Sequence, residues 1–187
     1  MMIMGMMLCR SFCAVVLLLA SAAVAVAGEA PASAAPPADK PFVVRAIVAG
    51  QTIVEAGKLA TAKATDKVKP LATRVVTDHA KVNATLMSLA EQRGIQPPQS
   101  RTERHRRTIE KLQNLQGNAF DRAFADVMVE DYRDVLALFK RQVEYGKDAD
   151  VRTFASDNLP ILEANYKSAR DFSKQLAAAT TTSRPAK

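Results

Sequence analysis

Apolar residues recur every three or four positions over most of residues 41–177, which is the period of an amphipathic α-helix. The pattern predicts four long helices, over residues 41–64, 67–93, 119–145 and 149–177. Residues 100–115 carry a weaker pattern, which leaves open a short additional helix that begins after Ser100 or Thr102. The long segments lack the strict alternation of a half-buried strand. Because each long helix has one apolar face to bury, we expect an all-α fold, an antiparallel four-helix bundle.

Residues that favour helix ends stand at the boundaries of these segments. Asp66, Asn118 and Asp148 each precede a predicted helix, where their side chains can accept hydrogen bonds from the first backbone N–H groups. Gly94 and Gly146 follow predicted helices, at positions where glycine commonly ends a helix. The capping pattern therefore agrees with the apolar periodicity.

Two features distinguish this bundle from a simple up-and-down arrangement. The connection over residues 94–118 is long enough to carry the chain from one end of the bundle to the other. The fourth helix contains Pro160, which lacks a backbone N–H and crowds the carbonyl of Ser156. Since the apolar row keeps its phase across the proline, we expect one kinked helix rather than two helices.

The first 27 residues have the pattern of a secretory signal peptide. Arg10 precedes an apolar run of about 15 residues, and Ala25-Val26-Ala27 places small residues at a cleavage site. An uncleaved membrane anchor is the alternative, but the run is shorter than the roughly 20 residues that span a bilayer. We therefore expect a bacterial protein that is exported to the periplasm or cell envelope and keeps no transmembrane span.

Segments without helical periodicity flank the predicted bundle. Residues 28–40 are rich in proline and alanine, which favours a flexible or polyproline-like tether. Residues 178–187 lose the apolar period again, and we expect a disordered tail there. The expected organisation is a signal peptide over 1–27, a tether over 28–40, one bundle domain over 41–177 and the tail.

Composition narrows the chemistry of the mature protein. Cys9 and Cys13 both lie in the segment expected to be removed, which leaves no disulfide, thiolate nucleophile or thiolate metal ligand. The formal charge is +7, and it falls to +6 without Arg10. A basic exported protein meets anionic lipids, lipopolysaccharide and cell-wall polymers rather than nucleic acid.

Four blocks of the sequence resemble a known family. They are FVVRAIVAGQTIVEAGKLA (residues 42–60), VTDH (76–79), FDRAFADVMVEDY (120–132) and LPILEANYKSA (159–169). These blocks are similar to the domain-of-unknown-function 4142 family, whose members are exported bacterial domains with a ferritin-like four-helix architecture. The resemblance implies a fold and a compartment, and it implies no established reaction.

The chain departs from the family at the positions that could bind a metal. The family pattern has an inward histidine on each of its third and fourth helices, where Tyr132 and Asn165 stand in this sequence. His79 remains from the family's histidines, and Glu55 matches the family's glutamate on the first helix. The resemblance therefore implies a site that has lost part of its ligand set.

A dinuclear iron site also fails on spacing. Such a site needs a Glu-x-x-His pair on each of two helices, and Val76 and Thr102 stand three residues before the two histidines, His79 and His105. We therefore expect no cofactor. A mononuclear site, with Glu55 and His79 as weak candidates beside Asp131, is an alternative. The favoured hypothesis is a hydrogen-bonded polar network in the bundle core, formed by Glu55, His79, Asp131, Tyr132 and Asn165.

A basic run in the long connection is the most distinctive surface feature. Residues 101–107 read RTERHRR and contain Arg101, Arg104, Arg106 and Arg107. On an anionic membrane each such charge contributes about 1 kcal/mol to binding. The run is thus a candidate site for anionic envelope components, and a solvated loop is the alternative.

The pattern gives no arrangement for catalysis. Asp78 and His79 are adjacent, and side chains one position apart on a helix do not face each other. We therefore expect a non-enzymatic interaction or structural module that binds an unknown envelope protein or an anionic cell-surface component. The alternative is a metal- or small-ligand-binding protein with a degenerate site.

Overall fold

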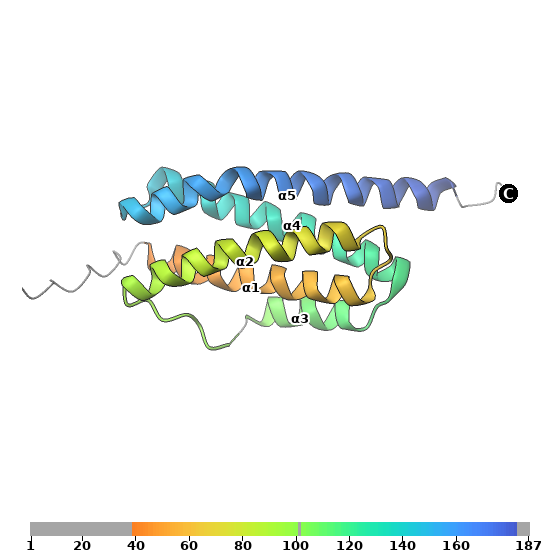
Figure 1. Ribbon diagram of the computed structural model, residues 1–187, viewed down its shortest axis with the longest axis horizontal. Coiled ribbons are helices and arrows are strands. Elements are labelled where there is room, and N and C mark those ends of the chain that lie inside the picture. Colours follow the sequence, from red (N-terminus) through yellow and green to blue (C-terminus); the bar gives the residue numbers. More distant parts are fainter. Residues whose placement is uncertain (1–38, 101, 183–187) are drawn as a thin grey trace, which may run out of the picture. The chain divides into compact units, whose positions relative to one another are not determined.

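The computed structural model describes residues 39–100 and 102–182, which form five α-helices and no strand (Figure 1). The helices are α1 (Lys40–Lys63), α2 (Lys69–Gln92), α3 (Glu103–Gln113), α4 (Gly117–Tyr145) and α5 (Ala149–Thr182). The all-α prediction is confirmed, and α1, α2, α4 and α5 correspond to the four long predicted segments. The predicted signal peptide and the tether up to residue 38 lie outside the described residues.

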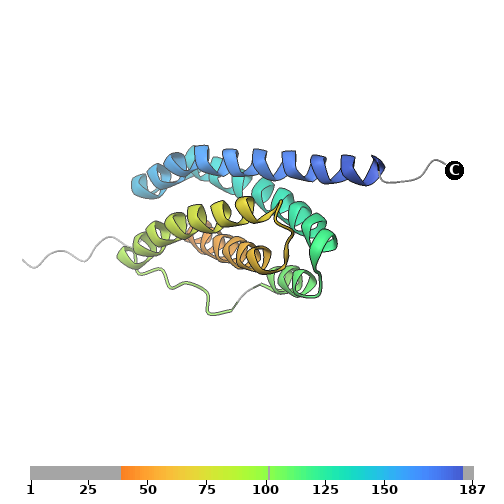
Figure 2. The same cartoon turned by 45° about the vertical axis from the view of Figure 1, so that its right-hand side comes forward.

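The long helices form two pairs. α1 packs along α2, α4 packs along α5, and α1 also contacts α4 (Figure 1). α2 and α5 share a smaller interface. α3 lies against α1 and α4 (Figure 2). Across the described residues, no helix combines the length and the apolar character that a bilayer crossing requires.

The connection between α2 and α4 carries the chain along the bundle, as predicted. Arg93, at the end of α2, bonds Asp148 just before α5. Near the other end, Thr65 between α1 and α2 donates to Asp121 of α4 from its backbone N–H (3.0 Å) and its hydroxyl (2.6 Å). α3 begins after Thr102, so the short helix that the sequence left open is present.

Two helix starts differ from the predictions. α1 begins at Lys40, and Asp39 before it is buried, so the last residues of the predicted tether belong to the bundle. α2 begins at Lys69, and Asp66 forms an ion pair with Lys69 instead of capping the helix. The partners of Asp39 lie more than 100 positions along the chain, so local sequence preferences do not specify them.

The two later long helices also depart from the prediction at their ends. Gln116 is the N-cap of α4, so Asn118 lies inside that helix. α5 continues to Thr182, which makes residues 178–182 of the expected tail helical. It passes through Pro160 as one helix, as predicted, while the expected kink stays a prediction.

The apolar faces of the helices close on a continuous core. Its largest fully buried side chains include Ile47, Ile53, Leu86, Phe120, Phe124, Met128, Tyr132 and Leu162. Small residues let α1 approach α2 closely. At Gly57, a Cβ would lie 2.6 Å from Cγ2 of Val76 and 3.4 Å from the carbonyl oxygen of Ala72.

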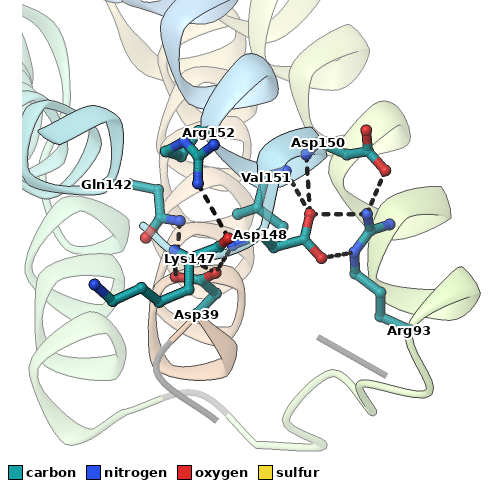
Figure 3. A network of polar contacts seen from close by, with 8 residues as sticks. All are labelled: Asp39, Arg93, Gln142, Lys147, Asp148, Asp150, Val151 and Arg152. Carbon is teal, nitrogen blue, oxygen red and sulfur yellow. Dashed lines mark hydrogen bonds and ion pairs between the residues drawn. The ribbon is translucent and has the colours of Figure 1, made fainter. Parts of the chain in front are cut away.

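A buried carboxylate fixes the start of α1 to the turn between α4 and α5 (Figure 3). Asp39 is 1% exposed, and its oxygens accept hydrogen bonds from the Gln142 side chain (3.0 Å), the Lys147 backbone N–H (2.9 Å) and the Asp148 backbone N–H. Since an unpaired buried polar group costs about 1–3 kcal/mol, these bonds hold both segments in place.

The same turn is joined to the end of α2. Asp148 accepts hydrogen bonds from the backbone N–H groups of Asp150 (2.9 Å) and Val151 (3.1 Å), so it caps α5 as predicted. Arg93 is 8% exposed and donates to Asp148 from Nε (2.7 Å) and Nη2 (2.9 Å), and to Asp150 (2.6 Å). We call Asp39, Gln142, Arg93, Asp148 and Asp150 the end clasp (Figure 3).

We expect Arg93→Met to lower the free energy of unfolding by about 3 kcal/mol, because it leaves a buried carboxylate without its cation. The hydrogen bond from Arg93 holds the pKa of Asp148 below its ordinary value. This stabilisation is therefore complete above the ordinary pKa of an aspartate, about 3.9, and is lost as the pH falls through the lowered value. Urea denaturation at pH 7 and in acid measures both effects.

Asp150→Asn is the matched control for that experiment. The Asp150 side chain is 76% exposed, so its ion pair with Arg93 contributes at most about 1 kcal/mol. If both substitutions lower the free energy of unfolding equally at pH 7, the Arg93–Asp148 pair is not the main source of stability in the end clasp.

Candidate functional site

A groove of about 250 Å³ opens between α1, α3 and α4. Its apolar lining comes from one face of α1, one face of α4 and the connection before α3: Val44, Val48, Ala49, Val135, Leu138 and Pro98. The spacing of four along α1 and three along α4 places these residues on single helix faces. Its polar lining includes Arg104 and His105 of α3 and Asp131 and Asp134 of α4.

The first turn of α3 is set by its cap. The Thr102 hydroxyl accepts a hydrogen bond from the backbone N–H of His105 (3.4 Å) and lies 2.7 Å from Nδ1 of the same histidine. This cap fixes where α3 begins and so places Arg104 at the edge of the groove.

Asp131 is the buried titratable group of this groove. It is 8% exposed, and one carboxylate oxygen, Oδ1, lies 3.5 Å from Nη2 of Arg104. The other oxygen, Oδ2, is buried and has no hydrogen-bond partner within the described part of the chain. Burial raises the pKa of Asp131 to about 6, although the positive charge of Arg104 acts in the opposite direction.

Arg104 joins α3 to α4 through several carboxylates. Its guanidinium donates to Asp134 (2.9 Å) and Glu130 (3.1 Å) and faces Asp131. The hydrogen bond to Asp134 raises the pKa of Arg104 further above its ordinary value. Arg104 is therefore already neutralised by side chains of α4.

The other arginines of the basic run also face carboxylates. Arg106 pairs with Glu103 and lies 4.0 Å from Glu110, and Arg107 lies 3.2 Å from Glu103. Arg101 lies outside the described residues. The candidate anionic-surface site at Arg101, Arg104, Arg106 and Arg107 therefore stays a prediction, and the three described arginines already have acidic neighbours.

A second polar centre lies in the bundle core. Nε2 of His79 is 3.0 Å from the Tyr132 hydroxyl, and both side chains are buried. Nδ1 of His79 has no hydrogen-bond partner among the residues described. Burial lowers the pKa of His79 to about 4, against the influence of Asp78, so the imidazole is neutral at physiological pH. Burial likewise raises the pKa of Tyr132.

Asn165 of α5 adjoins this centre. Its side-chain oxygen accepts hydrogen bonds from Nε (3.1 Å) and Nη2 (2.9 Å) of Arg74, and its Nδ2 donates to Asp78 (3.1 Å). A hydrogen bond between Asn165 and Tyr132 acts to lower the pKa of the tyrosine, against the larger effect of burial. Asn165, Tyr132 and His79 therefore lie together, on α5, α4 and α2.

The remaining members of the predicted core network are Asp131 and Glu55. Asp131 faces Arg104 at the groove, because α3 covers that side of α4. Glu55 is half-buried on α1. Within the described residues, no three or more histidine, cysteine, aspartate or glutamate side chains are grouped as a metal site requires. Glu55 and His79 thus gain no third such ligand there.

The pattern of the sequence did not reveal Arg74 or Asp39 as parts of polar networks. Asp39 stands directly before the Lys40-Pro41 start of α1, a position typical of a helix cap, and this was the available signal. Arg74 lies one helical turn before Asp78, and the spacing of four is typical of an ion pair. Neither signal identifies the partner on a distant helix.

A comparison with known protein families identifies the family of this chain. Residues 24–172 match the family described as "Domain of unknown function (DUF4142)". The chain belongs to the DUF4142 family. The resemblance seen in the sequence blocks is thereby confirmed. No curated protein matches this DUF4142 chain.

Two solved structures share the helical fold. A DUF305 fragment from Deinococcus radiodurans is 12% identical with a TM-score of 0.68, and the match covers 76% of this chain and 99% of that one. A conserved hypothetical protein, rv2844, from Mycobacterium tuberculosis is 20% identical with a TM-score of 0.54, over 72% and 96% of the two chains. At these identities the similarity extends to the fold alone.

We expect Asp131→Asn to stabilise the DUF4142 chain by about 1–2 kcal/mol at pH 8. The pKa of Asp131 in the fold, about 6, lies above the ordinary value of 3.8, so its ionised form is disfavoured by folding. The contribution of wild-type Asp131 is fully present below pH 3.8 and is lost as the pH rises through about 6. The gain from asparagine should therefore vanish in acid, which urea denaturation at pH 8 and pH 3.5 would measure.

Asp134→Asn is the control for this experiment, because the pKa of Asp134 is shifted in the opposite direction from that of Asp131. Burial acts to raise the pKa of Asp134, but the hydrogen bond and charge of Arg104, together with Arg133, lower it overall. Removal of its charge should therefore not stabilise the fold at pH 8. A loss of stability in Asp131→Asn at pH 8 would contradict the cost assigned to the buried carboxylate.

His79→Gln should flatten the acid sensitivity of the fold. The folded pKa of His79, about 4, lies below the ordinary 6.5, so its stabilising contribution is present above pH 6.5 and is lost as the pH falls through about 4. Glutamine does not titrate. Between pH 7.5 and pH 4, wild type should therefore lose ~3 kcal/mol relative to the variant in paired urea titrations. Parallel pH profiles would contradict the buried neutral imidazole.

Proposed function

We propose that this DUF4142 protein is a non-enzymatic binding module of the bacterial cell envelope, which holds a small apolar molecule in the groove between α1, α3 and α4. The observation that carries the proposal is the coincidence of an apolar lining with a buried, partly unpaired carboxylate at Asp131. Apolar pockets with a few convergent polar groups and a shifted pKa are the usual form of a ligand site.

The size of the groove supports a small ligand. Its volume of about 250 Å³ exceeds the roughly 150 Å³ of an engineered apolar cavity that binds benzene. It lies slightly below the roughly 300–1,000 Å³ of most ligand pockets. A ring system or an alkyl chain of moderate length fits this range.

Binding rather than catalysis agrees with the groups that line the groove. The Thr102 hydroxyl already serves as the cap of α3, beside His105. Arg104 is held by the carboxylates of α4. These groups already have structural roles, and the proposal therefore assigns no reaction.

Export and the ferritin-like relationship enter as parts of the same proposal. The apolar run before residue 27 supports export to the periplasm or envelope. A ferritin-like ancestry agrees with four long helices joined by a crossover. A bound metal has no part in this proposal, since a His–Tyr hydrogen bond occupies the centre where such proteins place their ligands.

An anionic cell-surface partner finds less support than an apolar ligand. Each described arginine of the 101–107 run has an acidic side chain beside it, which offsets its charge for an outside phosphate. An unknown envelope protein that supplies or receives the ligand remains compatible with the groove.

Direct binding of a neutral apolar dye tests the proposed groove. Nile red should bind the wild-type protein saturably, and Ala49→Phe, which places a ring in the groove, should weaken its affinity at least tenfold. Ala62→Phe is the matched control, since Ala62 is an exposed residue of α1 that does not line the groove. Fluorescence titration gives the affinities, and circular dichroism verifies that each variant folds. Unchanged affinity in Ala49→Phe would contradict the proposal.

A further inference from the structure

We propose that the groove selects apolar ligands that carry a primary ammonium group, and that this group donates a hydrogen bond to Oδ2 of Asp131. The inference rests on the proposed function and specifies the ligand class of the same groove. It goes beyond that function because it assigns Asp131 as the residue that determines specificity.

The first observation is that the buried carboxylates of this protein differ in how they are satisfied. Asp39 accepts hydrogen bonds at both oxygens from Gln142 and the Lys147–Asp148 turn. Asp121 accepts at Oδ1 and Oδ2 from Thr65. Asp131 is also buried, at 8% exposed against 1% for the other two, yet its Oδ2 has no partner within the described residues. This oxygen therefore lacks a donor that the fold supplies to the other two.

The second observation is that Asp131 lines an opening. Asp39 and Asp121 lie at contacts between segments of the chain, whereas Asp131 belongs to the wall of the groove. A donor that reaches Oδ2 can thus come with a ligand whose apolar part rests on Val48, Val135 and their neighbours. The residue that lacks a donor and the apolar lining therefore belong to the same groove.

The third observation concerns charge. Arg104 approaches the other oxygen of Asp131, Oδ1, at 3.5 Å, while its hydrogen bonds go to Asp134 and Glu130. Three carboxylates of α4 thus surround one guanidinium, and Arg133 adds a contact to Asp134 at 3.3 Å. This leaves the charge of Asp131 partly uncompensated on the side of Oδ2.

A cationic donor should bind the Asp131 carboxylate more strongly than a neutral donor. Hydrogen bonds between ionised partners are roughly twice as strong as neutral ones. An ammonium also lowers the pKa of a neighbouring carboxyl, which opposes the effect of burial on Asp131. An anionic ligand would instead meet Asp131 and Asp134, with Arg45 of α1 as its available cation.

Three ligands of matched length separate these cases. Octylamine, 1-octanol and octanoate compete with Nile red at pH 8, where the amine is protonated. We expect octylamine to bind at least tenfold more tightly than 1-octanol, and octanoate to bind most weakly. In Asp131→Asn the advantage of the amine should disappear, while the affinity for 1-octanol changes less than about threefold. Asp126→Asn, an exposed position on the same helix, is the matched control and should keep the advantage.

The pH profile adds a second readout. Below pH 6 the protonation of Asp131 should remove the preference for octylamine in wild type. The charged or titratable groups around Asp131 are Arg45 on α1, Arg104 and His105 on α3, and Glu130 and Asp134 on α4. The profile of Asp131→Asn identifies the share of these other groups. A preference that falls equally in wild type and Asp131→Asn would overturn the role of Asp131.

The outcomes distinguish the inference from the function on which it rests. If 1-octanol binds wild type, Ala49→Phe blocks it, and octylamine binds no better, the groove stands and the ammonium preference is overturned. Tightest binding of octanoate overturns it as well. If neither Nile red nor any of the three ligands binds saturably, the proposed function fails together with the inference.

Discussion

The groove depends on the end clasp, because buried charges at one end of the bundle fix how its helices meet. Asp39 ties the start of α1 to the α4–α5 turn, and Arg93 with Asp148 ties the end of α2 to the start of α5. The groove walls on α1 and α4 lie one to three turns from these contacts. Since a buried ion pair tolerates little displacement of either partner, the clasp restricts the spacing of those walls.

The connection between α2 and α4 supplies the third side of the groove. It must return the chain to the opposite end of the bundle, and α3 forms on the way, capped by Thr102. Ile109 and Leu112 bury the apolar side of α3, while Arg104 reaches Asp134 and Glu130 of α4. α3 thus covers part of the α1–α4 surface and leaves the rest open as a groove.

The sequence allowed prediction of the helices, because helical period gives the direction of each side chain. It placed His79 and Tyr132 in one core network without specifying that they pair. It did not allow prediction of the groove. Asp131 has the phase of a core residue, and whether it meets the core or a covering helix depends on α3, whose own periodicity is weak. Asp39 was assigned to a tether on composition, since its partner Lys147 lies more than 100 positions away.

Nδ1 of His79 and Oδ2 of Asp131 are both buried without a hydrogen-bond partner among the described residues, but the two side chains lie in different surroundings. Nδ1 of His79 lies in a core whose helices close around it, so the imidazole avoids charge and stays neutral. Asp131 belongs to the wall of an opening, where a bound molecule could supply the donor that the fold does not give to Oδ2. If Asp131→Asn stabilises the fold as expected, the carboxylate costs stability at this position, and such a cost beside an apolar groove supports the proposed binding role over a structural one.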